Sequence, residues 1–332
     1  MTVLNNAFMA GLETDYGQPS SLTNGIEVSG HSVKLERAIS SSVAPRPGAQ
    51  GEQADRNIIV NNGGAGSFTQ DVLTKGFGFW MQTLLGPATA PAQIGTTTAY
   101  ESTATTAIES PDLSYTLQAL QHDVASSENR FTHLGSVIHR WTLSHTIGSG
   151  NLALAADFVS QDVVEDVPAG IPEYPVGAIP YDGEAAVGMF TIDGGGARCV
   201  RSFELTAELG YLLNRKCLDG TTLLKRPERS TYPMFTGKIT MEWNGNDLYE
   251  KYKKAESVPI VGLYSGDEIE PGHNHEFGLS MPSCLITSDP IITHNTAGAS
   301  DVPMMEVEFK VQHDAAAGDM LSMRYKSTDT AF

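Results

Sequence analysis

Alternation of apolar and polar residues marks much of the chain as β-strand. The clearest case lies between residues 131 and 162, where two such runs flank Gly148-Ser149-Gly150. After this turn, four apolar residues alternate with mostly small or polar ones: Leu152, Leu154, Ala156 and Phe158. A period of two is that of a strand with one buried face, and the glycines supply the positive φ values that a tight hairpin needs. The pattern predicts a β-hairpin here.

The same period recurs in both halves of the chain. In the second half, Ile239, Met241 and Trp243 alternate with polar residues, and the alternation is complete from Met305 to Val311. The predicted strands span approximately residues 33–39, 58–60, 113–124, 135–147, 151–161, 200–209, 236–243, 277–286, 304–314 and 320–326.

Two segments carry apolar residues at helical spacing instead. In residues 70–85 one helix face is formed by four of them: Leu73, Phe77, Trp80 and Leu84. Thr69 is the expected N-cap and Gly86-Pro87 the expected end of this helix. A shorter helix is predicted over residues 246–255, with Asn246 as its cap.

Turn-rich segments divide the chain into predicted domains. Residues 1–30 are expected to form an irregular arm, residues 31–165 a first domain, residues 166–198 a linker or arm, and residues 199–328 a second domain. Residues 88–111 are expected to be a loop. In both halves the predicted elements follow the same order: a strand, a loop, a strand, a helix, a loop and further strands. This common order indicates an internal repeat. The predicted fold class is therefore mainly β, with two tandem β-sandwich-like or barrel-like domains, each carrying one flanking α-helix.

Charge and cysteine content narrow the function. The 332 residues include 21 Lys or Arg and 39 Asp or Glu, for a formal net charge of −18. A surface this acidic repels phosphate, so tight sequence-independent DNA binding is not expected. The three cysteines contain no C-x-x-C pair, which argues against a disulfide framework or a zinc site and fits a reducing cytoplasm. We expect no signal peptide in residues 1–10 and no membrane-spanning helix.

His273 and His275 are the strongest candidates for a metal site. They stand at i and i+2 of a predicted strand, and Asp267, Glu268 and Glu270 are near enough in sequence to add ligands. A polar turn explains the same residues more simply, because such a motif without further context is mostly coincidental. We therefore predict no metal-binding, catalytic or cofactor-binding residue, and no cofactor.

Two further motifs have simple structural interpretations. His139 and His145 lie at even spacing on one predicted strand; such a pair could be a pH switch, but packing on an amphipathic strand is the simpler interpretation, and we expect no metal there. The glycine-rich run at residues 63–66 lacks the Lys-Ser/Thr and the βαβ unit of a phosphate loop, so a flexible turn is predicted. With no nucleophile elbow and no zinc-protease motif, the chain is not expected to be an enzyme.

Several short motifs, taken in order, resemble the two-domain tail tube proteins (major tail proteins) of long-tailed, non-contractile bacteriophages. They are the E-x-x-Y-G-x-P opening at residues 13–19, F-W-M-Q-T-L-L-G at 79–86, the hairpin at 131–159, a T-G-x-x-T segment within 235–249, and closing strands at 279–282 and 307–314. Each motif alone is unspecific. Their order and their nearly end-to-end coverage carry the resemblance.

The resemblance implies a structural virion protein. Its copies are expected to form stacked rings, the tube through which genomic DNA is ejected, and both halves are expected to be tail-tube domains. Two such domains per chain imply a ring of three copies with pseudo-sixfold symmetry. The loops at residues 40–55 and 163–197, together with the N-terminal arm, are then expected to grip the adjacent ring.

The same resemblance implies a location and a set of partners. The protein is expected in the virion tail after assembly in the host bacterial cytoplasm. Its implied partners are further copies of itself and the tail tip or baseplate, tape measure and tail terminator proteins. Genomic DNA would pass through the lumen without specific binding, and no membrane is implied.

Other classes of protein stay open on the sequence alone. A tail terminator, a sheath protein, a capsid decoration protein or a contractile-tail tube would also be a virion assembly protein. A metal-dependent hydrolase would use His273, His275 and nearby acids. A secreted carbohydrate-binding β-sandwich would require a signal peptide, which is not evident.

Overall fold

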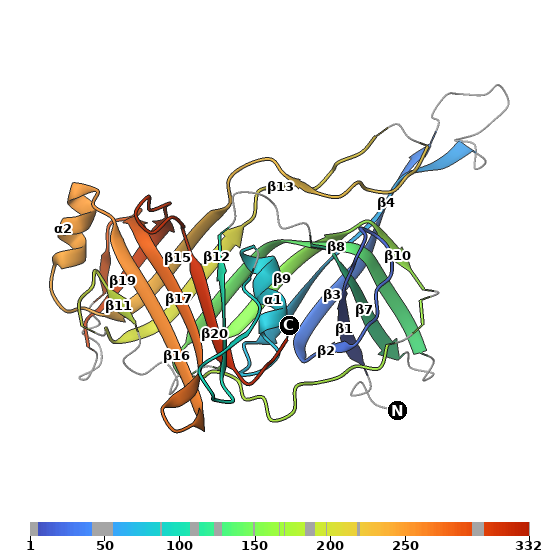
Figure 1. The fold of residues 1–332 in the computed structure, drawn as a ribbon. Coiled ribbons are helices and arrows are strands. Elements are labelled where there is room, and N and C mark those ends of the chain that lie inside the picture. Colours follow the sequence, from blue (N-terminus) through green and yellow to red (C-terminus); the bar gives the residue numbers. More distant parts are fainter. Residues whose placement is uncertain are drawn as a thin grey trace.

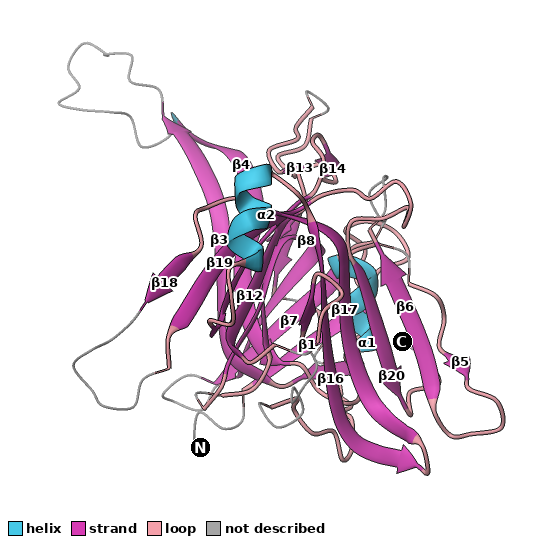
Figure 2. Ribbon diagram, turned by 90° about the vertical axis from the view of Figure 1, so that its left-hand side faces the viewer, coloured by secondary structure: helices cyan, strands magenta, loops and turns pink. Residues whose placement is uncertain are grey.

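Antiparallel strands make up most of the computed structural model, together with two short helices (Figures 1 and 2). The structure describes residues 6–41, 56–86, 88–106, 113–122, 128–148, 150–165, 167–168, 170–182, 190–196, 198–217, 220–293 and 302–331. The predicted mainly-β fold class with two helices is confirmed. None of the helices in these ranges is long and apolar enough to cross a membrane.

The described part of the first half contains ten strands and helix α1 (Gly78–Leu84). The strands are β1 (Ala7–Leu12), β2 (Asn24–Ile26), β3 (Val28–Ser41), β4 (Asn57–Asp71), β5 (Ala92–Gln93), β6 (Tyr100–Thr105), β7 (Tyr115–His122), β8 (Glu128–Thr146), β9 (Ala153–Ser160) and β10 (Asp162–Val164).

Among its described residues, the second half contains ten more strands and helix α2 (Asp247–Lys254). The strands are β11 (Thr191–Ile192), β12 (Val200–Glu208), β13 (Tyr211–Leu212), β14 (Glu228–Arg229), β15 (Met234–Glu242), β16 (Val258–Glu270), β17 (His273–Ile286), β18 (Ile291–Thr293), β19 (Met304–Val311) and β20 (Ser322–Ser327).

A single hydrogen-bonded sheet crosses from one half of the chain to the other. From one edge its order is β3, β4, β9, β8, β12, β15 and β19, after which β19 pairs with β17 and β18. The pairing of β8 with β12 is antiparallel and runs from Ser202 opposite Thr146 to Glu208 opposite Arg140. The two halves are therefore joined as neighbouring strands of one sheet. The domain limits at 31–165 and 199–328 stay a prediction.

The halves also share one hydrophobic core. Phe77, at the start of α1, packs edge-on against Phe277 of β17 with 5.3 Å between ring centroids. Residues 166–198, predicted to be a linker or arm, contribute β11 and the buried side chains of Tyr181 and Phe190 to this core. Folding of either half therefore buries surface of the other.

Six strand pairings of the first half recur in the second half in the same order along the chain. The equivalent pairs are β1–β7 and β11–β16, β3–β4 and β12–β15, β4–β9 and β15–β19, β7–β8 and β16–β17, β8–β9 and β17–β19, and β8–β10 and β17–β20. Helix α1 follows β4 as α2 follows β15. This recurrence supports the internal repeat expected from the sequence.

The repeat extends to one packing contact. Gly66 of β4 lies opposite Phe158 of β9, and Gly237 of β15 lies opposite Phe309 of β19. A Cβ on Gly66 would come within 2.5 Å of the Phe158 ring, and one on Gly237 within 2.3 Å of the Phe309 ring. In each half a phenylalanine therefore lies over a glycine of the neighbouring strand, a close approach that only glycine allows.

The structure corrects the prediction for residues 58–85. The helix begins at Gly78 and not at residue 70, Phe77 and not Thr69 is its N-cap residue, and Gln70 and Asp71 belong to β4. The glycine-rich run at 63–66, predicted to be a flexible turn, lies inside β4. All four of its residues pair with β3, and residues 64–66 also pair with β9. Glycine weakens a strand locally, but here the pairing on both sides and the packed neighbours determine the conformation.

Two segments expected to be irregular contain strands. Residues 7–12 form β1, which pairs with β2 and β7 and buries Phe8 and Met9. Within the predicted loop 88–111, β6 pairs with β20 of the second half. The Thr/Ala-rich sequence of β6 has little hydrophobic contrast, so its strand could not be recognised by alternation.

Replacement of Gly237 by alanine tests the glycine–phenylalanine contact. The added methyl group must displace the Phe309 ring in a packed core, so we expect Gly237→Ala to lower the free energy of unfolding by about 1–3 kcal/mol. In the matched variant Gly30→Ala a Cβ meets no atom within 4 Å, and a change within about 0.5 kcal/mol is expected. Urea denaturation followed by circular dichroism measures both. Equal stability of the two variants would contradict the contact.

Candidate assembly surfaces

The residues considered as candidate metal ligands lie on the β16–β17 hairpin and do not converge. His275 is buried, and burial together with the nearby Lys75 ammonium lowers the pKa of its imidazole. Glu268 accepts a hydrogen bond from the Gly272 N–H at 3.1 Å, and Glu270 accepts one from the Thr98 N–H at 3.0 Å. Among the described residues, no group of three or more His, Cys, Asp or Glu side chains is arranged to hold a metal ion.

The two histidines of β8 occupy different environments. His145 is buried, and its Nδ1 lies 3.3 Å from the hydroxyl of Tyr264. His139 falls at a β-bulge between Ile138 and Arg140 and is half-buried. Burial lowers the pKa of both imidazoles. The structure thus places both residues in packing positions.

A buried carboxylate fixes the N-terminal segment. Glu13 accepts hydrogen bonds from the backbone N–H groups of Gly17 and Gly135 at 2.9 and 2.8 Å, and from the hydroxyls of Ser114 and Thr116 at 2.7 and 3.0 Å. Four donors compensate the lost hydration of the carboxylate. The glutamate of the E-x-x-Y-G-x-P motif therefore holds the N-terminal segment against β7 and β8 through hydrogen bonds. The sequence alone did not reveal this structural role.

One face of the long sheet is polar. A row of directly opposed residues crosses six strands on this face: Thr69, Ala155, Thr142, Thr206, Thr236 and Lys310. The hydroxyls of Thr142 and Thr206 lie 3.0 Å apart across the junction of the two halves. The opposite face of the same strands carries core residues such as Phe158, Leu143 and Phe309. The sheet therefore presents a continuous surface of short polar and charged side chains, which we call the polar face.

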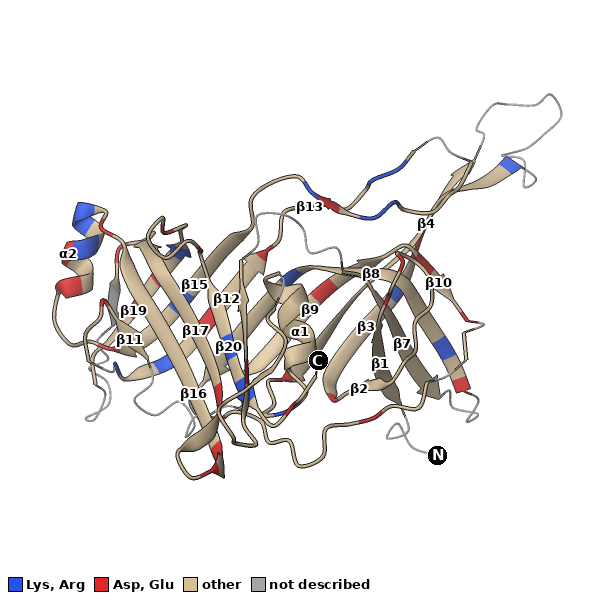
Figure 3. Cartoon of the chain, viewed as in Figure 1, with Lys and Arg blue, Asp and Glu red and all other residues tan. Residues whose placement is uncertain are grey.

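Acidic residues dominate the charge of the polar face. Ten charged side chains alternate outward from these six strands: Asp71, Asp157, Glu204, Glu208, Glu242, Glu306 and Glu308, with Arg140, Lys238 and Lys310. The Lys238 ammonium lies 2.8 Å from the Glu306 carboxylate, and this contact raises the pKa of Lys238. Because the acids outnumber the bases, the polar face has a net negative charge (Figure 3).

The long sheet ends in two incompletely paired strands. In the described part of the chain, β3 pairs only with β4, and β18 pairs only with β19. An unpaired edge is a site for addition of another strand. The C-terminal part of β8 is the first-half equivalent of β18. It pairs with β12 on the side where β18 has no described neighbour.

Side chains on β3 are less buried than their equivalents on β12. Val33 lies opposite Gly66, and Leu205 lies opposite Gly237, the equivalent glycine of the second half. Val33 and Leu205 are therefore equivalent, and so are Leu35 and Ala207, each two residues further along its strand. Leu205 and Ala207 are fully buried, whereas Leu35 is 43% exposed. The difference arises because β12 has a strand on each side and β3 does not.

The outer part of the β3–β4 hairpin projects from the body (Figure 1). Residues 211–217 and 220–229 of the second half, which include β13 and β14, extend beside it. The Asn62 N–H donates to the Thr222 carbonyl at 3.0 Å, and the Lys216 ammonium donates to the Val60 carbonyl at 3.0 Å. We call the projecting unit, residues 35–41, 56–62, 211–217 and 220–229, the spur. Its hairpin exposes Ile39 and Ile58 by 61% and 64%.

Comparison with known families identifies the class of protein. A family model described as phage tail tube protein matches residues 4–305. The chain therefore belongs to the phage tail tube protein family and is a structural protein of a phage tail. No curated protein matches the chain significantly.

A pH dependence follows from a third histidine of β8. His133 is buried, its Nδ1 lies 3.0 Å from the Ser160 hydroxyl, and burial lowers the pKa of its imidazole to about 4. In the unfolded chain this pKa is about 6.5. As the pH falls, the His133 imidazole is therefore protonated in the unfolded state before it is protonated in the folded state. Its contribution to folding stability is complete above pH 6.5 and is lost between about pH 6.5 and 4.

Replacement of His133 by glutamine should remove this loss. Between pH 7 and pH 5 the unfolding free energy of the unaltered protein should fall by about 2 kcal/mol more than that of His133→Gln. Urea denaturation at both pH values measures the difference. Parallel decreases in the two proteins would show that His133 is not held neutral by the fold.

Proposed function

We propose that the protein forms the tail tube of a long-tailed, non-contractile phage, as stacked rings whose channel conducts DNA during ejection. The observation that supports rings is the β8–β12 pairing, in which two topologically equivalent halves are joined edge to edge within one sheet. A junction of this kind, repeated between copies, extends the sheet from one copy to the next. Repetition around an axis then closes this row of strands and covers its two end strands, β3 and β18.

The repeat specifies which edges meet between copies. Within the chain, the C-terminal part of β8 lies between β9 and β12. Its counterpart in the second half is β18, which lies beside β19, and the counterpart of β12 is β3. The junction between copies therefore pairs β18 of one copy with β3 of the next. This pairing would bury Leu35 as β8 buries Ala207.

Three copies complete the ring in this account. Each chain contributes two equivalent halves and one internal junction, so three chains give six halves and six junctions. The expected symmetry is threefold, with pseudo-sixfold repetition of the halves. Closed rings of identical chains are a common outcome of such edge-to-edge contacts.

The polar face suits the lining of the channel. Its opposite side is the hydrophobic core, which leaves the polar face as the side of the sheet that is compatible with water. Its excess of carboxylates repels the phosphates of DNA, which disfavours tight binding during ejection. The channel would thus guide DNA without a specific contact, a role that requires neither catalysis nor a cofactor.

The remaining partners follow from this role. Further copies of the chain form the ring and the stack, and the tape measure, tail tip or baseplate and tail terminator proteins would contact the lumen or the ends of the tube. Assembly would take place in the host bacterial cytoplasm, without a membrane. The loops at 40–55 and 163–197 and the N-terminal arm remain candidates for ring-to-ring contacts. Residues 42–55 lie outside the described part of the chain.

A lysine on the exposed side of β3 tests the junction between copies. We expect Leu35→Lys to leave thermal unfolding nearly unchanged, because this side chain is already 43% exposed in the single chain, and to prevent ring closure, because the junction would bury an unpaired ammonium group at this position. Tyr249→Lys on α2, where the native side chain is 37% exposed, is the matched control. Sedimentation velocity measures assembly. Rings formed by Leu35→Lys as readily as by the control would contradict the β18–β3 junction.

Deletion of residues 40–55 tests the grip between rings. We expect the shortened chain to fold, because the described core is formed by residues outside 40–55, and to form rings that do not stack. Circular dichroism reports folding, and electron microscopy distinguishes rings from tubes. Tubes formed by the deletion variant would refute this role of the loop.

A further inference from the structure

A pocket lies where four separate segments of the chain meet. They are β2, the end of β4, the start of α1 and residues 173–175, and the volume that they enclose is about 250 Å³. At ~30 Å³ for each water in the liquid, this volume corresponds to roughly eight waters. The pocket is therefore large enough for a small organic molecule.

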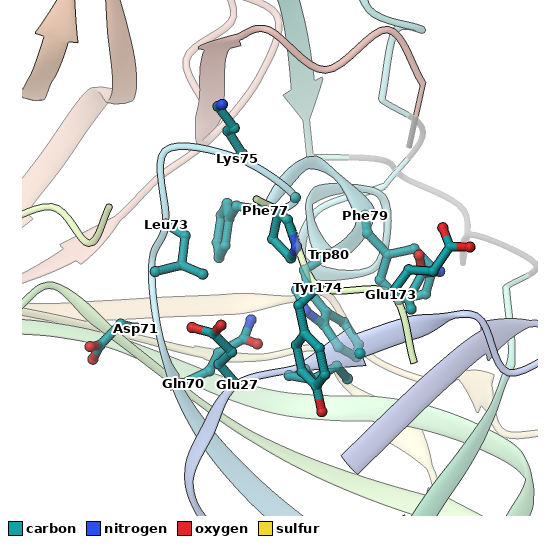
Figure 4. A pocket seen from close by; sticks show the side chains of 15 residues that line it. Glu27, Gln70, Asp71, Leu73, Lys75, Phe77, Phe79, Trp80, Glu173 and Tyr174 are labelled. Carbon is teal, nitrogen blue, oxygen red and sulfur yellow. The ribbon is translucent and has the colours of Figure 1, made fainter. Parts of the chain in front are cut away.

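Aromatic side chains form the wall of the pocket (Figure 4): Phe77, Phe79, Trp80 and Tyr174. The rings of Phe79 and Trp80 pack edge-on with 5.0 Å between their centroids. Phe77 and Trp80 are buried, whereas Tyr174 is 40% exposed at the rim. Aromatic faces attract cations and also cover aliphatic chains. The wall therefore suits an organic cation better than a hydrated metal ion.

The rim of the pocket is fixed by the fold. Residues 173 and 24 form a parallel bridge, in which the Glu173 N–H donates to the Thr23 carbonyl at 2.7 Å and the Gly25 N–H donates to the Glu173 carbonyl at 3.0 Å. A Cβ on Gly25 would come within 2.8 Å of the Tyr174 ring. The pocket is thus formed before any ligand arrives, which lowers the entropic cost of binding.

Two carboxylates of the pocket have no partner among the described residues. Figure 4 shows Glu27 on one side of the Tyr174 ring and Glu173 on the other. Both are exposed, and neither side chain makes a hydrogen bond or an ion pair with a described residue. Burial, together with the Glu27 carboxylate, raises the pKa of the Tyr174 hydroxyl. Negative potential therefore extends over the aromatic wall.

The other two charged groups of the lining are engaged elsewhere. Asp71 accepts a hydrogen bond from the Asn151 side-chain N–H at 2.8 Å and belongs to the polar face. The Lys75 ammonium donates to the Val176 carbonyl at 3.2 Å. Figure 4 shows the lysine side chain directed away from both glutamates. The pocket therefore keeps two carboxylates that no described base neutralises.

The side-chain amide of Gln70 is a further group that lacks a partner. Gln70 lines the pocket, is only 6% exposed, and makes no side-chain hydrogen bond to a described residue. Its amide lies on the same side of the Tyr174 ring as Glu27 (Figure 4). Burial of an amide without a hydrogen bond is costly. A donor held in the pocket would remove this cost, because the amide oxygen can accept from it.

We propose that the pocket binds a linear aliphatic diammonium cation, the chemical class of the polyamines. One ammonium group donates to Glu27 and to the Gln70 amide oxygen, the methylene chain lies along the aromatic wall, and the second ammonium group donates to Glu173. Two positive charges match the two unpaired carboxylates, and hydrogen bonds between ionised groups are the strong ones. The inference concerns the single chain and does not depend on ring formation.

The site predicts which features of a ligand matter. A monoamine leaves one carboxylate unpaired, and a diol of the same length pairs with neither charge. The pocket exists only in the folded chain, so the diamine should also raise the temperature of unfolding as its concentration exceeds the dissociation constant. Both effects should weaken as salt rises, because the carboxylates are exposed and salt screens them.

Isothermal titration calorimetry at low salt tests the proposal. We expect 1,4-diaminobutane to bind at one site per chain, butylamine to bind roughly tenfold more weakly, and butane-1,4-diol not to bind. Glu27→Gln and Glu173→Gln should each weaken the diamine roughly tenfold, because each removes one charge-assisted bond. In either variant the diamine should lose most of its advantage over butylamine. Circular dichroism confirms that the variants are folded.

A matched control separates this site from general attraction to an acidic chain. Glu250→Gln removes an exposed carboxylate from α2, outside the pocket, and should bind the diamine like the unaltered protein. Magnesium chloride should not compete at equal concentration. Equal affinities for diamine and butylamine, or unchanged affinity in both pocket variants, would overturn the proposal. A lysine-containing peptide that binds where the diamine does not would also overturn it and assign the pocket to a protein partner.

Discussion

The pairing of β8 with β12 is the constraint on which the rest of the structure depends. It joins two equivalent sets of strands into one sheet, and it determines which side chains lie on the polar face and which in the core. Because the join uses one edge of each half, it leaves β3 and β18 at the two ends of the row of strands that runs through both halves. An edge of this kind is a liability in an isolated chain. In our account it is the means of assembly.

Strong alternation was sufficient to find most of the strands. Phe203, Leu205 and Ala207 of β12, and Ile239 and Met241 of β15, are buried as the period predicts. Helix α2 was also predicted nearly to the residue. The errors fall where tertiary contacts override a local signal. A helical stripe from Leu73 to Leu84 could not indicate that Gln70 and Asp71 pair with β9.

Glycine was the other source of error. The run at 63–66 has the composition of a turn, yet it lies in a paired strand, and a Cβ on any of its three glycines would come within 3.0 Å of a neighbouring atom. The assembly surfaces were inaccessible to sequence analysis for a related reason. Leu35 and Ala207 both continue an apolar alternation, and only the presence of a strand beside β12 and not beside β3 distinguishes their burial. The family resemblance, in contrast, was carried by motif order and is confirmed by the family model.

The central claim is that the sheet of one copy continues into the next around a closed ring. Electron microscopy of the concentrated protein, averaged over end-on views, tests it most directly. Our account predicts hollow rings with threefold symmetry and six similar lobes, with the polar face toward the channel. Closed rings of six complete chains, or particles of a single chain at every concentration even with the tail-tip initiator present, would contradict it.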